Sequence, residues 1–277
     1  MVEKGELRPT TATRLFHVSR ASLYKPLRTG AVRRLRGDET RMRTLVRGVA
    51  EQHITSGYRR VWSVLRKKQG ILVSRKRVRR IMKEEGLLRE VHFPRPRLPA
   101  TGNQAADEPN QRWMSDITYI DTTDRGPVGL IAVVDTCTRE LLAWDLPLSC
   151  GAAETFQVVE QAVLARFPKT GKAVGVKLKT DGGAQYLANY FQDRARQLGL
   201  SLETRRKRRP EDGGIIESFN GHFKIDYVYT HEPMTYVETL RAMAGYARDY
   251  NEERPHSSLD YMTPAEYYQT KMKEAKG

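Results

Sequence analysis

The part of the chain after residue 110 carries apolar runs of the length and spacing typical of strands and amphipathic helices. The run VGLIAVVD, at Val128–Asp135, is continuously apolar and predicts a buried central strand. Further strands are predicted over Trp113–Ile120, Leu141–Leu146, Val174–Thr180 and Leu200–Thr204, and helices over Ala152–Phe167, Gln185–Leu198 and Ile215–Tyr229. The order β-β-β-α-β-α-β-α predicts an α/β fold, a mixed sheet with helices on both faces.

Before residue 93 the apolar positions follow helical spacing instead. Helices are predicted over Thr10–Phe16, Ser19–Leu27, Arg41–Ile54, Gly57–Gln69 and Arg75–Glu85. Ser74 is the expected N-cap of the last of these, whose apolar residues Val78, Ile81 and Met82 fall at i, i+3 and i+4. A helix, a turn and an N-capped basic helix indicate a helix-turn-helix, whose second helix enters the DNA major groove. The alternative is an ordinary three-helix bundle with a solvated charged face.

Residues 93–110, FPRPRLPATGNQAADEPN, contain four prolines and no hydrophobic periodicity. They predict a linker between a basic helical region, residues 1–92, and an α/β core with a C-terminal helical tail, residues 111–277.

Charge separates the same two parts. The whole chain has a net charge of +15, but residues 1–100 alone carry +18 and the remainder −3. A basic segment joined to a near-neutral one indicates a nucleic-acid-binding part attached to a part with another task. The alternative, a generic solubilising surface, does not explain why the excess is so one-sided.

Three acids fall where chemistry could use them. Asp116 lies within the first predicted strand of the core, Asp181 at the end of the fourth before Gly182-Gly183, and Glu217 in the first turn of the helix that starts at Ile215. Lys224, two turns after Glu217, points the same way. Two divalent ions about 4 Å apart can activate and stabilise the oxygens of a phosphodiester, and hard carboxylate ligands suit Mg²⁺. We therefore expect the three carboxylates to converge. The 35 residues between Asp181 and Glu217 are weak support alone, and three unrelated surface acids are the alternative.

Other charged residues are candidate DNA contacts. On the predicted recognition helix they are Arg75, Arg77, Arg79, Arg80 and Lys83, and in the loop before Glu217 they are Arg205, Arg206, Lys207, Arg208 and Arg209. The alternatives are a solvated helix face and a charged flexible loop, and for Lys224 a solvated lysine.

For several other residues, a structural role is favoured over a functional one. Asp135 ends an apolar strand, and a structural role is favoured over that of a fourth site carboxylate. Trp113 and His256 are expected to pack, and the two cysteines, Cys137 and Cys150, to be inert. No apolar run reaches the 18 residues of a membrane span, and no secretory signal is visible. The expected compartment is a reducing cytoplasm.

Beyond these patterns, the chain resembles a known family. The segments WMSDITYI, TDGGAQY and IIESFNGHFK, with a lysine seven residues after the glutamate, resemble the retroviral-integrase-like DDE transposases. The segments YNEERPHSSLDYMTPAEYY and GYRRVWSVLRKKQGILVSRKRVRRIMKEEGLL resemble the end and the helix-turn-helix of the second-frame protein of insertion sequences of the IS three family. The likeness covers about residues 10–268. The zinc-binding histidines and cysteines of retroviral integrases have no counterpart here.

The resemblance implies a ribonuclease H-like fold preceded by a helix-turn-helix domain, with Asp116, Asp181 and Glu217 as catalytic ligands of Mg²⁺ or Mn²⁺, two ions being expected. It implies that Lys224 contacts DNA near the active site, and that the partners are terminal inverted repeats and target DNA, bound by a homo-oligomer. It also implies a first-frame fusion partner and a place beside the bacterial nucleoid. Two other readings stay open at this point: a DNA-binding regulator with a decayed nuclease-like domain, and a ribonuclease H-type nuclease without strand transfer.

Overall fold

The computed structural model describes residues 31–53, 55–88, 105–205, 213–228, 230 and 234–275, with the backbone alone for residues 31–37. The chain divides into two compact units, residues 1–48 and 49–277. The predicted helices within residues 10–27, the candidate contacts Arg206–Arg209 and linker residues 93–104 lie outside the described residues. The linker boundary therefore stays a prediction.

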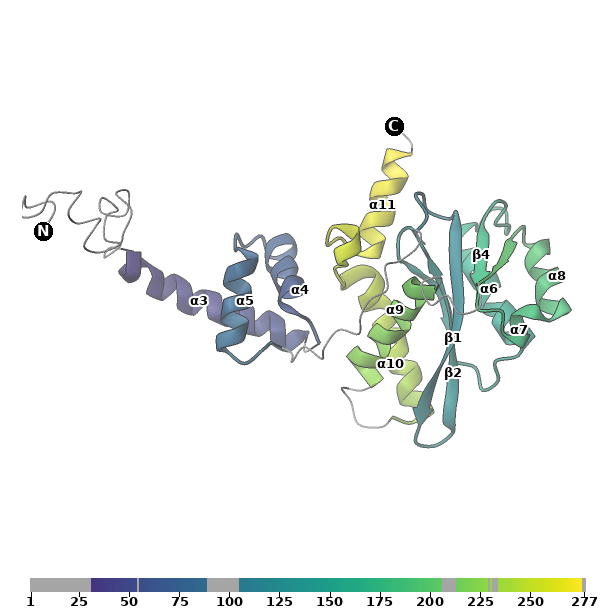
Figure 1. The fold of residues 1–277 in the computed structure, drawn as a ribbon, viewed down its shortest axis with the longest axis horizontal. Coiled ribbons are helices and arrows are strands. Elements are labelled where there is room, and N and C mark those ends of the chain that lie inside the picture. Colours follow the sequence, from purple (N-terminus) through teal and green to yellow (C-terminus); the bar gives the residue numbers. More distant parts are fainter. Residues whose placement is uncertain are drawn as a thin grey trace, which may run out of the picture. The chain divides into compact units, whose positions relative to one another are not determined.

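The helices predicted over Gly57–Gln69 and Arg75–Glu85 lie where the pattern put them, whereas the one predicted over Arg41–Ile54 begins earlier, at Ala31 (Figure 1). They are α3 (Ala31–Gln52), α4 (Tyr58–Ser63) with its π-helical continuation η1 (Val64–Lys68), and α5 (Arg75–Glu84). The side chain of Ser74 accepts a hydrogen bond from the backbone N–H of Arg77, so the predicted N-cap is confirmed. The predicted stripe of Val78, Ile81 and Met82 is fully buried. The turn before α5 is held by the Trp62 indole, which donates to the carbonyl of Val73 at 2.9 Å.

The core is a five-stranded mixed sheet in the order β3-β2-β1-β4-β5. Its strands are β1 (Arg112–Thr122), β2 (Gly126–Asp135), β3 (Leu141–Asp145), β4 (Lys177–Thr180) and β5 (Ser201–Thr204). The first three strands pair antiparallel, whereas β4 pairs parallel with β1 and with β5. The predicted mixed sheet is therefore confirmed, with β1 at its centre.

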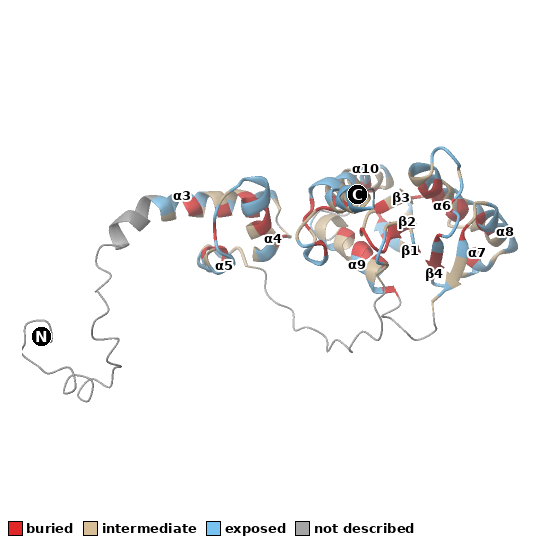
Figure 2. Ribbon diagram, turned by 90° about the horizontal axis from the view of Figure 1, so that it is seen from above, coloured by how far each residue is buried: buried red, intermediate tan, exposed pale blue. Residues whose placement is uncertain are grey.

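Helices cover both faces of this sheet, as Figure 1 shows. On one side lie α6 (Ala152–Arg166), α7 (Ala184–Leu187) and α8 (Asn189–Gln197), and on the other α9 (Gly214–Phe223) and α10 (Tyr236–Arg248). Two separate apolar clusters result, one on each face. Figure 2 shows the buried positions concentrated along the strands and on the helix sides that meet them. Trp113, fully buried in the first cluster and stacked on Phe167, has the packing role expected of it.

The remaining elements follow α9 and α10 along the chain. They are η3 (Lys224–Val228), η4 (Asp249–Glu253), η5 (Ser257–Leu259) and α11 (Pro264–Glu274). Both α10 and α11 begin with a capping box, Thr235 with Glu238 and Thr263 with Glu266, in which each side chain binds the other's backbone N–H. These caps fix where the tail helices start.

Candidate active site

The three predicted acids come from neighbouring elements. Asp116 lies at the middle of β1, opposite Ala132 of β2. In the parallel pairing of β1 with β4, Met114 lies beside Lys179, and continuing that register by two residues brings Asp181, which follows β4, to the level of Asp116. Glu217 occupies the first turn of α9. Each acid is on the element that the sequence predicted.

Alternation along β1 turns Asp116 toward α9. Side chains of a strand point alternately to its two faces, and Met114 and Ile120 pack in the α9–α10 cluster whereas Trp113 and Ile117 pack in the other. Asp116 shares the parity of Met114 and Ile120. It therefore faces the helix that carries Glu217, which docks on the sheet through the buried side chains of Ile216, Phe219 and Phe223.

One arginine lies between two of the acids. Arg205 follows β5 directly, and its guanidinium is 3.3 Å from Oδ1 of Asp116 and 3.3 Å from Oε1 of Glu217. Its side chain is only 12% exposed, against 49% for Glu217. Gly213, the N-cap of α9, leaves room for it, because a Cβ at that position would lie 2.3 Å from Nη1 of Arg205.

Asn220 completes the surroundings of Asp116. Its Nδ2 donates to Oδ2 of Asp116 at 2.9 Å, and its own Oδ1 is buried without a hydrogen-bond partner. Asn220 is one helical turn beyond Glu217, so both project from the same side of α9. The sequence pattern did not identify Asn220 as a site residue.

The electrostatics at Asp116 favour a bound cation. Burial raises the pKa of its carboxyl to about 6; the positive charge of Arg205 opposes that shift, and the charges of Asp181 and Glu217 add to it. A carboxyl in this position is ionised at neutral pH but destabilised by its acidic neighbours. A divalent cation would offset both the burial of the charged carboxylate and its repulsion by Asp181 and Glu217.

The turn at Asp181 depends on glycine. Gly182 has φ of +77°, a left-handed conformation that side-chain-bearing residues rarely adopt, and a Cβ there would also lie 2.6 Å from Cγ2 of Thr204. The turn lets Oδ1 of Asp181 accept the backbone N–H of Gly183 at 2.9 Å. The Gly182-Gly183 pair thus forms a tight turn directly after Asp181.

The expected convergence of the acids is found only in part. Asp116 and Glu217 share one guanidinium, and the charge of Asp181 acts on Asp116. Among the described residues, however, no three His, Cys, Asp or Glu side chains are close enough together to hold a metal ion. The donor chemistry nevertheless suits a hard cation, because it offers three carboxylates and the unpartnered Oδ1 of Asn220. Arg205 occupies the position between the acids instead.

The other described candidate residues lie on η3 and α5. Lys224 is half-buried at the start of η3, directly after α9. On α5, Arg75, Lys76, Arg79, Arg80 and Lys83 are exposed and Arg77 is half-buried. The guanidinium of Arg75 lies 4.2 Å from the centroid of the Trp62 ring, and that of Arg80 lies 3.1 Å from Glu84. The exposed basic face predicted for α5 is thus present, and its arginines also have partners within the chain.

Asp135 has the structural role favoured for it. It is fully buried at the end of β2 and accepts backbone N–H groups from Asn110 at 2.7 Å, Cys137 at 2.8 Å and Thr138 at 2.9 Å. Both cysteines are free, and burial raises the pKa of both thiols, that of Cys137 to about 11, which keeps them protonated and unreactive. His256 packs edge-on against Tyr250, and burial lowers its pKa to about 3, which agrees with a structural role.

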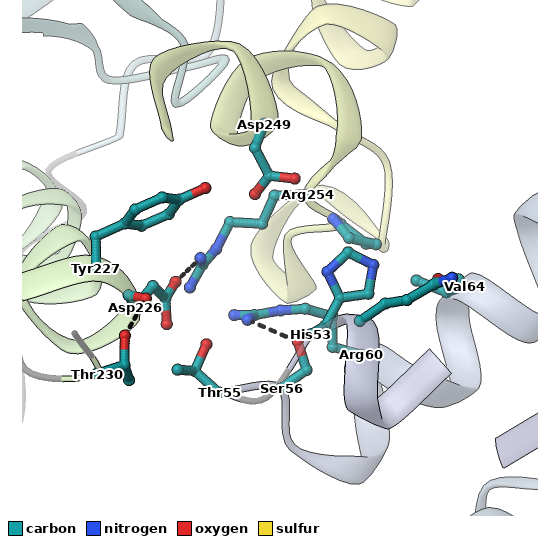
Figure 3. A pocket seen from close by; sticks show the side chains of 12 residues that line it. His53, Thr55, Ser56, Arg60, Val64, Asp226, Tyr227, Thr230, Asp249 and Arg254 are labelled. Atoms are coloured by element: carbon teal, nitrogen blue, oxygen red, sulfur yellow. Dashed lines mark hydrogen bonds and ion pairs between the residues drawn. The ribbon is translucent and has the colours of Figure 1, made fainter. Parts of the chain in front are cut away.

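A pocket away from the acids has a volume of about 330 Å³ and is drawn in Figure 3. Its lining includes a buried ion pair, Asp226 of η3 with Arg254, and a hydrogen bond from Arg60 to the Ser56 hydroxyl. None of the three acids of the candidate site lines it. Arg254 comes from the tail motif ERPH, so this pair fastens the tail to the segment that follows α9.

Comparison with known proteins agrees with this architecture. The family described as an integrase core domain matches residues 106–210, a second integrase core domain family matches residues 198–264, and an HTH-like domain matches residues 38–95. Transposase InsD for insertion element IS2A/D/F/H/I/K of Escherichia coli is 34% identical over 267 residues, which cover 92% of this chain and 89% of that protein. Transposase InsD for insertion element IS2-9 of Escherichia coli (strain K12) is also 34% identical, over 92% of this chain and 87% of its own length.

Among solved structures, a chain of the simian T-cell lymphotropic virus intasome in complex with PP2A regulatory subunit B56 gamma has a similar fold. The TM-score is 0.51 at 17% sequence identity, over 81% of this chain and 74% of that one. A likeness at this identity concerns the fold, and it agrees with the ribonuclease H-like sheet expected from the sequence. Within the described residues, no helix is long and apolar enough to cross a membrane.

Proposed function

This chain belongs to the insertion-element transposases with an integrase core domain, and on that premise we propose that Asp116, Asp181 and Glu217 are the acids with which it cuts and joins DNA. The supporting observation is their placement. Asp116 and Glu217, 101 positions apart in the sequence, meet at one guanidinium, and Asp181 comes from the strand beside Asp116. Strand cleavage and strand transfer at the ends of a mobile element are the reactions that this family performs.

We propose Mg²⁺ or Mn²⁺ as the cofactor, in two sites shared by the three carboxylates. Bound there, the ions would supply the charge that activates the attacking oxygen and stabilises the leaving one. The protein's own contribution is positioning. Asn220 orients Asp116 through the 2.9 Å hydrogen bond, the N–H of Gly183 orients Asp181, and the apolar stripe of α9 holds Glu217 against the sheet.

The presence of all three acids favours an enzyme over a DNA-binding regulator with a decayed core. A regulator would have no need to keep Asp116 charged in a site where burial and acidic neighbours raise its pKa to about 6. Keeping ionisable groups in such an environment is typical of functional sites.

DNA is the proposed partner, through two surfaces. The exposed basic side chains of α5 suit the major groove of the terminal inverted repeats, and Lys224, together with the basic residues 206–209, suits phosphates near the acids. Arg205, which pairs with Asp116 and Glu217, is not one of these contacts. We further propose that the active form is a homo-oligomer on DNA. A first-frame fusion partner and a place beside the nucleoid remain predictions from the resemblance.

The test is a plasmid assay with labelled inverted-repeat ends, scored for nicked and for joined products. Asp116→Asn, Asp181→Asn and Glu217→Gln each keep the side chain's shape but remove a ligand charge. We expect each to reduce both products to below a few per cent while DNA binding stays within about twofold. The control is Asp193→Asn, an exposed acid of α8, which should leave both products unchanged.

The outcomes test both the set of metal ligands and the class of enzyme. Residual activity in one variant removes that residue from the set of ligands. Nicked without joined products from the unaltered protein would favour a ribonuclease H-type nuclease over a transposase.

A further inference from the structure

Arg205 does not lie where a phosphate-binding arginine would be expected. Its side chain is 12% exposed, its guanidinium is 3.3 Å from one oxygen of Asp116 and of Glu217, and its Nε is buried without a partner. Its backbone N–H donates to the carbonyl of Thr180 at 2.8 Å, which continues the β4–β5 ladder by one residue. The base of this side chain is therefore fixed to the sheet, and its charged end lies between the acids.

The surroundings are shaped for this position. Gly213 presents no side chain, and a Cβ there would lie 2.3 Å from both Nη1 of Arg205 and Oε1 of Glu217. The backbone of Gly213, with φ of −113°, is one that alanine can adopt. Space for the guanidinium, rather than backbone freedom, is the local use of this glycine.

We propose that Arg205 is a tethered counter-cation that occupies the acid site before the metal does, and that metal binding displaces it. The inference rests on the proposed function of the three acids as metal ligands. The guanidinium occupies the position between Asp116 and Glu217, and its positive charge would repel a divalent cation bound by the same two carboxylates. Arg205 and the metal are therefore competitors for one set of ligands, and Arg205 keeps the acids together until the metal arrives.

Competition has a thermodynamic consequence that a purely structural role lacks. If Arg205 leaves the acids when metal binds, its removal weakens only the metal-free state. Removal of Arg205 should therefore tighten metal binding and lower the melting temperature of the metal-free protein. At saturating metal, the variant and the unaltered protein should have the same melting temperature. A structural arginine would instead lower the melting temperature equally with and without metal.

The experiment measures Mn²⁺ binding by calorimetry and melting temperature with and without Mn²⁺, on the full chain. Arg205→Gln should bind Mn²⁺ about threefold to tenfold tighter than the unaltered protein, as expected when about 1 kcal/mol of charge-assisted hydrogen bonding no longer has to be broken. Arg196→Gln, an exposed arginine of α8 paired with Asp193, is the matched control and should bind Mn²⁺ with unchanged affinity.

A second variant separates occupation of the site from a general effect of charge. Arg205→Lys keeps the positive charge but replaces the guanidinium that contacts both acids by a single ammonium, so it should also tighten Mn²⁺ binding. If only Arg205→Gln does so, the arginine acts through its charge at a distance, and the proposed occupation is wrong.

Asp116→Asn distinguishes failure of the inference from failure of the proposed function. Loss of Mn²⁺ binding in Asp116→Asn, with equal affinity in Arg205→Gln and the unaltered protein, would overturn only the counter-cation. Mn²⁺ binding that is unaffected by Asp116→Asn, or absent from every variant, would overturn the metal site and the counter-cation with it.

Discussion

Asn220 is the residue through which α9 acts on β1. Its amide holds Oδ2 of Asp116 while Arg205 holds Oδ1, so both oxygens of the central acid are oriented before any ligand arrives. Hydrogen bonds to a charged group contribute about 1.5–3 kcal/mol each. Loss of the amide would remove the hydrogen bond to Oδ2, so that the carboxylate of Asp116 is less firmly oriented.

We therefore expect Asn220→Ala to lower the rate of end nicking by about tenfold or more, which corresponds to about 1.4 kcal/mol of lost positioning. The half-saturating Mn²⁺ concentration should rise, while DNA affinity stays the same. Ser218→Ala, on the exposed side of the same helix, is the control. An unchanged rate, or a fall in rate explained entirely by a lower melting temperature, would show that Asn220 only packs.

At this scale the sequence identified the acids but not their neighbours. Position on a strand, at a strand end and in a first helical turn can be predicted from local patterns, and all three assignments hold. The partner of a charged residue depends on which distant segments pack together. In the sequence, residues 205–209 are therefore five equivalent candidates for DNA contacts. The structure describes Arg205 alone of the five, and its guanidinium faces the acids.

Among the elements, the end of β2 shows how one buried carboxylate can organise a turn. Asp135 accepts three backbone N–H groups, one of which belongs to Asn110 just before β1. The entry to the central strand and the exit from its neighbour are thereby joined at one side chain. A charged acceptor with several N–H donors is stable in the interior because its hydrogen bonding is complete.

Asp135→Asn should lower the free energy of unfolding by about 2–4 kcal/mol, since the amide replaces an acceptor with a donor that faces backbone N–H groups. Urea denaturation measures this, with Asp107→Asn at an exposed position as the control. Mn²⁺ affinity should not change. A variant that folds with normal stability but loses Mn²⁺ binding would make Asp135 the fourth site carboxylate instead.

Element boundaries show where local patterns stop being informative. The predicted fourth strand began at Val174, but β4 begins at Lys177, because Gly175 has φ of +86° and Val174 is 79% exposed. The helix predicted over Gln185–Leu198 is interrupted at Ala188, which is extended between α7 and α8. An alanine gives no signal of such a break. The helix predicted over Ile215–Tyr229 is α-helical only to Phe223 and continues as the π-helix η3.

Across the whole molecule, net charge is distributed very unevenly along the chain. Residues 1–100 carry a net charge of +18 and the rest −3, so the affinity for DNA should come mainly from the first part. Binding that releases counterions weakens steeply with salt, by a slope of about −0.9 per neutralised phosphate.

Single substitutions in the full chain separate recognition of the DNA sequence from general attraction to the phosphate charge. Arg77→Ala, in the first turn of α5, should reduce the preference for terminal over random DNA by about 1–3 kcal/mol. Lys83→Ala, at the end of α5, should weaken binding to both DNAs alike and reduce the salt slope by about 1. Binding titrations at several salt concentrations measure both effects, with Lys169→Ala, an exposed lysine of the core, as the control. Equal loss on both DNAs from Arg77→Ala would assign sequence reading to another part of the chain.

The position of Asp116 inside β1 also limits how the gene can change. Because Asp116 faces α9 only through the alternation of the strand, loss or gain of one codon between Arg112 and Asp116 would turn the carboxylate to the α6 face and reverse the two apolar sets with it. The hairpin turn at Thr123–Arg125 lies outside that alternation, but it is bonded to the start of α10, where Asp124 accepts the backbone N–H of Tyr236 at 2.7 Å. Length variation among descendants of this element should therefore be purged from the strand, whatever residues substitution brings there.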